Sequence, residues 1–317
     1  MVYLLLILGL VILIGSANVL VAGASSIAKK FNVPNLIIGL TVVSFGTSFP
    51  ELIINILASI NNQDDLAVGN VVGSNTINIL LVIGFSALLK PIKVQNSTVR
   101  YEIPFSILAM LVLLFSANDV FFDGTEQGVL SRSDGLVFMI FFLLFIYYTF
   151  IVSKNSSQNQ EEGHLVTQRN MWVSTAFLII GVAGLYFGGV LIVDNATIIA
   201  IDLGLSEAVV GILVIALGTS LPELATSAVA AYRGNADMAV GNIVGSNIFN
   251  VFFVLGLSMS ISPIKFNPLL NIDIVVALFS SLMLYIFVFT RKGRQIDRVE
   301  AIAFLVLYGA YVSWLLV

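Results

Sequence analysis

Long apolar runs separated by short polar connections dominate the chain and leave few folds open to it. A bilayer core needs about 20 apolar residues per helix. Only 10% of the 317 residues are charged and 58% are hydrophobic, whereas roughly a quarter are charged in a soluble domain. We therefore expect an all-α membrane protein in a lipid bilayer, with ten transmembrane helices. The expected spans are residues 3–28, 36–60, 66–89, 102–118, 134–153, 172–198, 207–231, 238–261, 271–290 and 297–316.

The distribution of Lys and Arg predicts how these spans are oriented. With ten spans the connections alternate between two sides, and twelve of the 14 basic residues fall on one side. Cytoplasmic connections carry the excess of Lys and Arg. The polar linker 154–171 lies on that side, between a first unit, 1–153, and a second unit, 172–317. We expect a cell-membrane protein whose linker is cytoplasmic and whose two termini are extracellular.

The two predicted units repeat each other at an offset of 172 residues. Gly46–Leu52 aligns with Gly218–Leu224, and Ala67–Asn75 aligns with Ala239–Asn247. Roughly 24 of the 53 positions from 41 to 93 are identical without a gap, which indicates a duplication. Each copy has five spans, an odd number, so the second copy enters the membrane inverted. Inverted repeats are typical of secondary transporters, whose sites lie near the midplane on interrupted helices.

Glu51 and Glu223, which match in the repeat, are the only acids deep inside confidently apolar spans. A charge at a bilayer centre costs at least ~2.5–3.5 kcal/mol, so such a residue is a functional candidate. A buried ion pair is the structural alternative, but no Lys or Arg is placed mid-span. A proline precedes each acid, so we expect Gly46–Ser48 and Gly218–Ser220 to leave helical geometry and free their carbonyls for a cation. A simple proline kink is the other interpretation.

Polar side chains in the third and eighth spans recur every four residues and so share one helix face. Hard cations such as Ca²⁺ take about six to eight oxygen ligands. The same side chains also join helices to one another, and for the first residue of each set both roles stay open. The two sets are Asn70, Ser74 and Asn78, and Asn242, Ser246 and Asn250.

The motif G-T-S-x-P-E followed by G-N-x-x-G-S-N-x-x-N, present twice, resembles the alpha repeats of the cation/calcium antiporter superfamily. The similarity is greatest to prokaryotic sodium/calcium exchangers and spans essentially the whole chain. It implies a ten-helix fold that exchanges Na⁺ for Ca²⁺, usually three for one, with no cofactor and no obligatory protein partner. The ion ligands that the resemblance implies are Thr47, Ser48, Glu51, Ser74, Asn78, Thr219, Ser220, Glu223, Ser246 and Asn250, with the backbone carbonyls of Ser44 and Ala216.

One departure from the family pattern concerns potassium. Potassium-dependent relatives commonly carry an aspartate at one of the positions that Asn78 and Asn250 hold here. The site then has only two formal negative charges, which one Ca²⁺ neutralises and three Na⁺ exceed by one. We expect no K⁺ dependence, because a further monovalent cation would be uncompensated.

Two alternatives to sodium/calcium exchange remain open. A proton/calcium antiporter of the same superfamily would use the two acids to carry protons, although the hydroxyl-rich motif favours Na⁺. A membrane scaffold that kept the fold would not need two intact motifs. No nucleophile–base pair or cofactor motif indicates an enzyme, and no basic patch indicates nucleic-acid binding.

Overall fold

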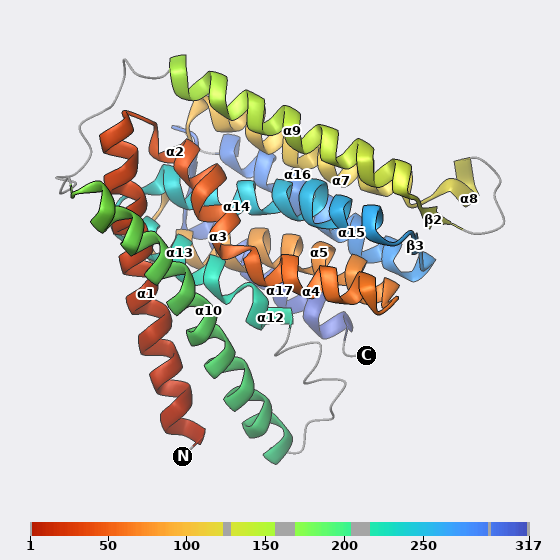
Figure 1. The fold of residues 1–317 in the computed structure, drawn as a ribbon, viewed down its shortest axis with the longest axis horizontal. Helices are drawn as coiled ribbons and strands as arrows, with labels where there is room; N and C mark the ends of the chain where they lie inside the picture. Colours follow the sequence, from red (N-terminus) through yellow and green to blue (C-terminus); the bar gives the residue numbers. More distant parts are fainter. Residues whose placement is uncertain (1, 123–127, 156–168, 204–215, 291–292, 316–317) are drawn as a thin grey trace.

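The structure, a computed structural model, is almost wholly helical (Figure 1). It describes residues 2–122, 128–155, 169–203, 216–290 and 293–315. Eight helices in these ranges are long and apolar enough to cross a membrane, and one bent pair makes a ninth span. The protein is therefore a multi-pass helical membrane protein. The expected span 207–231 and the linker 154–171 lie partly outside the described residues, so ten spans and the two units remain predictions.

The first broken span consists of four consecutive elements and is bent by 49°. The break itself is confined to Ser48 (φ −85°, ψ 11°). The expectation that Gly46 and Thr47 also leave helical geometry is wrong, because the Ser48 N–H still closes the last turn on the Ser44 carbonyl at 2.9 Å. The elements are α2 (Asn35–Ile38), the π-helical segment η1 (Gly39–Val43), α3 (Ser44–Thr47) and α4 (Phe49–Ile60).

A second break of the same kind separates α12 (Ala216–Thr219) from α13 (Leu221–Tyr232). Its single non-helical residue is Ser220 (φ −86°, ψ 2°), followed by a proline in the first turn of α13. Proline has no N–H, so it fits the start of a helix and cannot continue the preceding one. In both broken helices the proline therefore begins a new half-helix.

Two long helices with a π-helical segment in the middle form the core. Their apolar windows are 78% and 94% buried, against 17–33% for the helices after α15. A π-helical segment adds a residue to a turn and often marks a functional site. The first helix comprises α5 (Asp64–Ile77), η2 (Asn78–Ile83) and α6 (Gly84–Leu89), and the second comprises α14 (Ala236–Ile248), η5 (Phe249–Leu255) and α15 (Gly256–Ile261).

The peripheral helices surround this core and expose large apolar side chains, as expected for lipid-facing surface. Between the core and α9, rings stack closely, for example Phe141 on Phe252 at 5.1 Å between centroids. The peripheral elements are η3 (Thr98–Glu102), α7 (Ile103–Ser116), α8 (Asp119–Phe122), α9 (Arg132–Asn155), η6 (Pro268–Leu270), α16 (Asn271–Thr290) and α17 (Arg298–Leu315).

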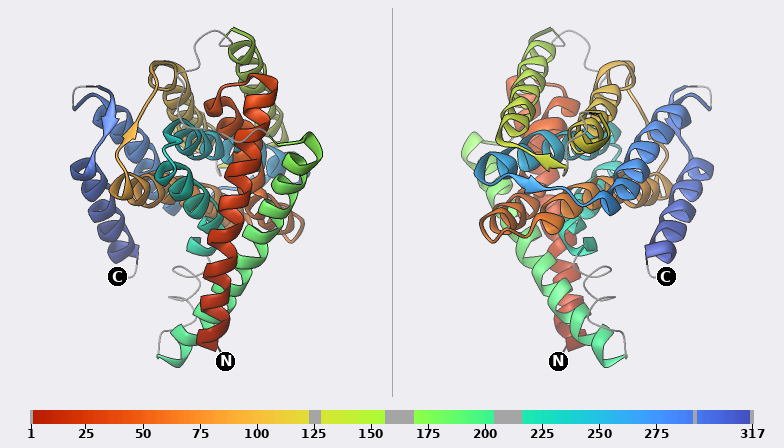
Figure 2. Two further views of the ribbon diagram at one scale, coloured as in Figure 1. Left: turned by 90° about the vertical axis from the view of Figure 1, so that its left-hand side faces the viewer. Right: turned by 90° about the vertical axis from the view of Figure 1, so that its right-hand side faces the viewer.

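Helices α1 (Val2–Phe31) and α10 (Met171–Asp202) lie side by side and cross the others obliquely (Figures 1 and 2). Glycine permits their close approach: a Cβ on Gly181 would lie 2.7 Å from the Leu20 Cβ. Helix α10 also covers both breaks, since Val182 lies against Gly46 and Val193 against Gly218.

Two short antiparallel ribbons tie distant connections together. β1 (Ile92–Lys93) pairs with β4 (Gln295–Ile296), and β2 (Val129–Leu130) pairs with β3 (Ile264–Lys265). In register, Ile92 lies opposite Ile296, and Leu130 opposite Ile264. Each ribbon joins a segment before residue 154 to a segment after residue 171.

Candidate functional site

The two intramembrane acids lie in the first turns of the half-helices that follow the breaks. Glu51 is on α4 and Glu223 on α13, with 1% and 0% of their surface exposed. The N-terminal end of a helix carries partial positive charge and unpaired N–H groups, which favour a carboxylate there. The breaks therefore place two acids at depth where the backbone itself compensates part of their charge.

Hydroxyl groups join the two acids across the breaks. Ser48, the break residue of the first span, donates to the Glu223 Oε1 at 2.8 Å. In addition, Thr219 lies beside the Glu51 carboxylate and Thr47 lies beside the Glu223 carboxylate. Ser74 and Ser246 donate to the Oε1 atoms of Glu51 and Glu223 at 3.5 and 3.4 Å. The structure thus gathers seven of the predicted ligands around the two carboxylates: Thr47, Ser48, Glu51, Ser74, Thr219, Glu223 and Ser246.

Several buried oxygens of the predicted ligands have no hydrogen-bond partner in the protein. Eight buried side-chain oxygens in the described ranges are unpaired, and five belong to predicted ligands. Unpaired buried polar atoms are uncommon, and each calls for an explanation. Carboxylate, amide and hydroxyl oxygens are the donors that Ca²⁺ takes. The five are Glu51 Oε2, Glu223 Oε2, Asn78 Oδ1, Asn250 Oδ1 and Ser220 Oγ.

Comparison with known proteins places the chain in a family. The family model for sodium/calcium exchanger proteins matches residues 1–151 and 173–317. The chain belongs to the sodium/calcium exchanger family. It is 39% identical to the inner membrane protein YrbG of Escherichia coli over 98% of this chain and 94% of that protein. It is 33% identical to the sodium/calcium exchanger MaX1 of Methanosarcina acetivorans, with 98% and 97% of the two chains covered.

Solved structures of this exchanger family share the fold. The sodium-calcium exchanger NCX_Mj, soaked with zero Na⁺ and Ca²⁺, matches with a TM-score of 0.83 and 34% identity, covering 98% of each chain. With 10 mM Na⁺ and 10 mM Sr²⁺ the TM-score is 0.81. The predicted relationship to prokaryotic sodium/calcium exchangers is confirmed.

The sequence reasoning missed two asparagines that contact predicted ligands. Asn75 and Asn247 lie within the repeated motif but were assigned no role there. Asn78 Nδ2 donates to Asn247 Oδ1 at 3.0 Å, and Asn250 Nδ2 donates to Asn75 Oδ1 at 3.2 Å. The identity of both residues across the repeat was a signal that could have identified them.

Asn70 and Asn242, for which two roles were open, brace neighbouring helices. Asn70 Nδ2 donates to Asn55 Oδ1 at 2.6 Å, and Asn242 Nδ2 donates to Ser227 Oγ at 2.9 Å. Thr47 Oγ1, a predicted ligand, donates to Asn242 Oδ1 at 3.1 Å. These contacts favour a role for Asn70 and Asn242 in joining helices. The Thr47 hydroxyl uses its hydrogen in this contact and keeps its lone pairs for a cation.

The two predicted backbone ligands differ in their surroundings. The Ser44 carbonyl accepts from the Ser48 N–H at 2.9 Å and from Thr47 Oγ1 at 3.3 Å. The single Thr47 hydroxyl hydrogen is shared between this carbonyl and the nearer Asn242 Oδ1, so the carbonyl keeps a lone pair that a cation could take. In the second broken span the Ser220 N–H donates to the Leu217 carbonyl at 3.1 Å rather than to that of Ala216.

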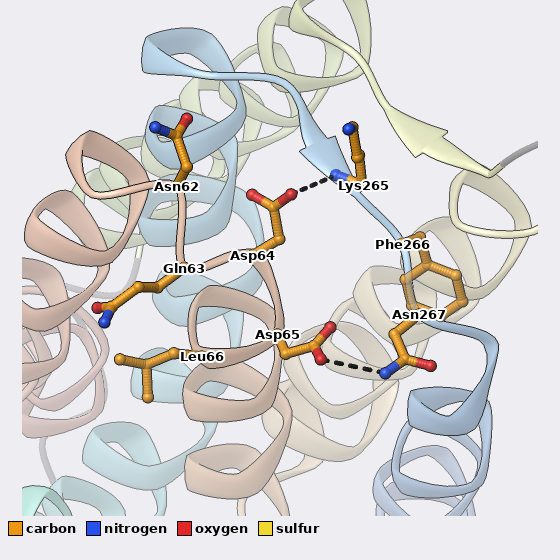
Figure 3. A pocket seen from close by; sticks show the side chains of 8 residues that line it. All are labelled: Asn62, Gln63, Asp64, Asp65, Leu66, Lys265, Phe266 and Asn267. Atoms are coloured by element: carbon orange, nitrogen blue, oxygen red, sulfur yellow. Dashed lines mark hydrogen bonds between the residues drawn. The ribbon is translucent and has the colours of Figure 1, made fainter.

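A polar hollow that includes neither Glu51 nor Glu223 in its lining lies where α5 begins, beside β3 (Figure 3). Its two acids already have partners: Asp64 Oδ2 accepts the Lys265 N–H at 3.0 Å, and Asp65 Oδ2 accepts Asn267 Nδ2 at 3.1 Å (Figure 3). At the start of α14, Gln95 Nε2 likewise donates to Asp237 Oδ2 at 2.6 Å. These contacts fasten the ends of the core helices.

Proposed function

We propose that the chain is a secondary-active antiporter that exchanges Na⁺ for Ca²⁺ by alternating access. One observation carries the proposal: both intramembrane carboxylates and both repeated amides have a buried oxygen with no hydrogen-bond partner in the protein. No three His, Cys, Asp or Glu side chains come together among the described residues, so neutral oxygens must complete any cation site. Two carboxylates with hydroxyl and amide oxygens suit one Ca²⁺ or several Na⁺.

The proposed ligands are those that the resemblance implies, with roles divided by chemistry. Glu51 and Glu223 supply the charge, while Ser48, Ser74, Ser220 and Ser246 supply hydroxyl oxygens. Thr47, Thr219 and the amides of Asn78 and Asn250 add neutral oxygens, and the carbonyls of Ser44 and Ala216 complete the set. Na⁺ and Ca²⁺ compete for this one group of oxygens.

The proposed movement is a joint shift of α1 and α10 over the broken helices. Their close glycine contact makes them one unit, and α10 lies against Gly46 and Gly218, two residues before the breaks. A shift of this pair would open the site to one side at a time. Coupling follows because two bare carboxylates are costly in a closed, dry cavity, which disfavours crossing without ions.

The proposed arrangement has ten spans in two inverted five-helix repeats, with both termini outside and the linker in the cytoplasm. The recurrence of the broken span, the π-helical core helix and the ribbon strands after residue 171 supports it. The inversion would bring the two acids together near the midplane.

The test is Ca²⁺ uptake into proteoliposomes loaded with Na⁺ in a Na⁺-free medium, for the native protein, Glu51→Gln and Glu223→Gln. We expect uptake that requires the Na⁺ gradient and is lost in both variants. Glu102→Gln is the matched control, because Glu102 is also a buried glutamate but hydrogen-bonds Tyr148 outside the cluster. Uptake driven only by a pH gradient would assign the protein to proton/calcium exchange, and no uptake under either gradient would support the scaffold.

We also propose three Na⁺ per Ca²⁺ and no use of K⁺. Two carboxylates bind one Ca²⁺ with no net charge and three Na⁺ with one excess charge, so the exchange moves charge across the membrane. We expect Na⁺-driven Ca²⁺ flux to be unchanged when K⁺ replaces choline on both sides. Because the exchange carries net charge in the direction of Na⁺ movement, we also expect it to slow when the side that receives Na⁺ is made electrically positive. A strict requirement for K⁺ would contradict this charge count.

A further inference from the structure

The amide oxygens of Asn78 and Asn250 can face a cation only if the two amide groups are held the right way round. An amide carries NH₂ at one edge and oxygen at the other. In both residues the NH₂ group is engaged by another asparagine, and the oxygen is buried and unpaired. If either amide were rotated by half a turn, its NH₂ group would face the cation. Its oxygen would then lie against the side-chain oxygen of Asn247 or Asn75.

A backbone carbonyl sets this orientation for one of the pairs. Asn75 Nδ2 donates to the Asn247 carbonyl at 3.1 Å. A carbonyl only accepts hydrogen bonds, so it holds the NH₂ edge of Asn75 towards itself and leaves the Asn75 oxygen for Asn250. The chain of contacts runs from the Asn247 backbone through Asn75 to Asn250, and it leaves the buried Asn250 oxygen without a hydrogen-bond partner in the protein.

The contacts cross between the two parts of the chain in both directions. Asn247, on α14, holds Asn78 at the start of η2, while Asn75, on α5, holds Asn250 in η5. Asn75 and Asn247 are 1% and 2% exposed, so water does not replace these contacts. Each core helix therefore orients the ligand that the other presents.

We infer that Asn75 and Asn247 are positioning residues that set cation affinity by holding the amides of Asn250 and Asn78. The inference rests on the proposed exchange of Na⁺ and Ca²⁺ at this site. Neither residue has a side-chain oxygen among the unpaired atoms, so both act through the ligand beside them. Their loss affects the half-saturating Ca²⁺ concentration more than the maximal flux, because a disordered amide weakens binding without blocking the movement of α1 and α10.

A double-mutant cycle tests this role. Asn247→Ala is expected to raise the half-saturating Ca²⁺ concentration about tenfold, equivalent to about 1.4 kcal/mol, with maximal flux nearly unchanged. In an Asn78→Asp background the same substitution is expected to cause no such rise, because a carboxylate presents oxygen at both edges and has no NH₂ group for the Asn247 oxygen to hold. The pair Asn75→Ala and Asn250→Asp forms an independent second cycle.

The outcomes of these experiments distinguish a positioning role of Asn247 from a purely structural role. They also distinguish failure of this inference from failure of the proposed function. Equal effects of Asn247→Ala in both backgrounds, or an unchanged half-saturating concentration in the native background, would overturn the inference. The Ca²⁺-dependent rise in thermal stability in detergent gives a second readout of affinity that does not depend on flux. If Asn247→Ala does not fold, the Asn75 cycle decides. A native protein without Na⁺-driven Ca²⁺ uptake overturns the proposed function instead.

Discussion

At the scale of single residues, Ser48 links the two broken helices, because it lies at the break of one and hydrogen-bonds the acid of the other. It is the one non-helical residue between α3 and α4, and its hydroxyl donates to Glu223 on α13 at 2.8 Å. The same oxygen atom of Glu223 accepts from Ser246 at 3.4 Å. With Oε1 occupied by these donors, Oε2 is the atom left for a cation.

Ser48→Ala is expected to raise the half-saturating Ca²⁺ concentration about ten- to hundredfold, because a hydrogen bond to a charged group contributes about 1.5–3 kcal/mol and the carboxylate loses its orientation. Na⁺-driven uptake over a range of Ca²⁺ concentrations measures this. Ser59→Ala is the control, since Ser59 is equally buried but donates to the Asn55 carbonyl within α4. Similar effects of the two substitutions would show that Ser48 acts only through packing.

Acidification is expected to inhibit exchange by competition at Glu51 and Glu223. Protonation removes negative charge from a site that has only two carboxylates, so Ca²⁺ binding weakens as pH falls and recovers as it rises. The expected result is a half-saturating Ca²⁺ concentration that increases at acid pH while maximal flux is restored by more Ca²⁺. A fall in maximal flux at saturating Ca²⁺, with unchanged half-saturation, would contradict competition at the carboxylates.

At the scale of elements, the α1–α10 pair contrasts with the packing around it. Glycines on α10 line the contact between the two helices. Because Gly181 and Gly188 have no Cβ, the backbone of α1 at Leu20 and Leu13 can pack directly against α10. A smooth contact of this kind lets two long helices stay together without interlocking side chains. Helix α14, in contrast, is enclosed on almost all sides.

Gly181→Ala is expected to separate α1 from α10 and to lower the free energy of unfolding by about 1–3 kcal/mol, as overpacking does. The added Cβ would meet Leu20 N and Cα at 2.9 Å, and backbone atoms have little freedom to yield. Thermal unfolding in detergent measures the change. Gly15→Ala is the matched control on α1, because a Cβ there meets nothing within 4 Å; an equal loss in both variants would exclude a packing cause.

Sequence reasoning predicted the broken spans, the two acids and the family, because proline, intramembrane charge and the repeat each leave a direct mark on the sequence. It placed the breaks too broadly, since whether Thr47 stays helical depends on one backbone hydrogen bond. It also missed the orienting role of Asn75 and Asn247. That role depends on which atoms of opposing helices meet, and no spacing within one helix reveals this.

At the scale of the whole molecule, the proposed orientation follows from twelve basic residues on one side of the membrane. The chain has no natural cysteine, so single cysteines can report it directly. We expect a cysteine at His164, in the linker, to resist a membrane-impermeant maleimide in intact spheroplasts. A cysteine at the exposed Ser133 is expected to react. The reverse pattern would invert the assignment, and labelling at both positions would contradict the number of spans between them.

The ties between early and late segments bear on how such a chain could have arisen. Both ribbons, the Asp65–Asn267 and Asp237–Gln95 contacts, and the asparagine pairs each join a residue before position 154 to one after position 171. If the two units are the inverted repeats proposed above, a half-length ancestor could have satisfied these groups against a second copy of itself inserted the opposite way. Such an ancestor would have been a dimer of dual topology, with its two subunits inserted in opposite orientations. Duplication and fusion of its gene would then have linked the two subunits covalently in one chain.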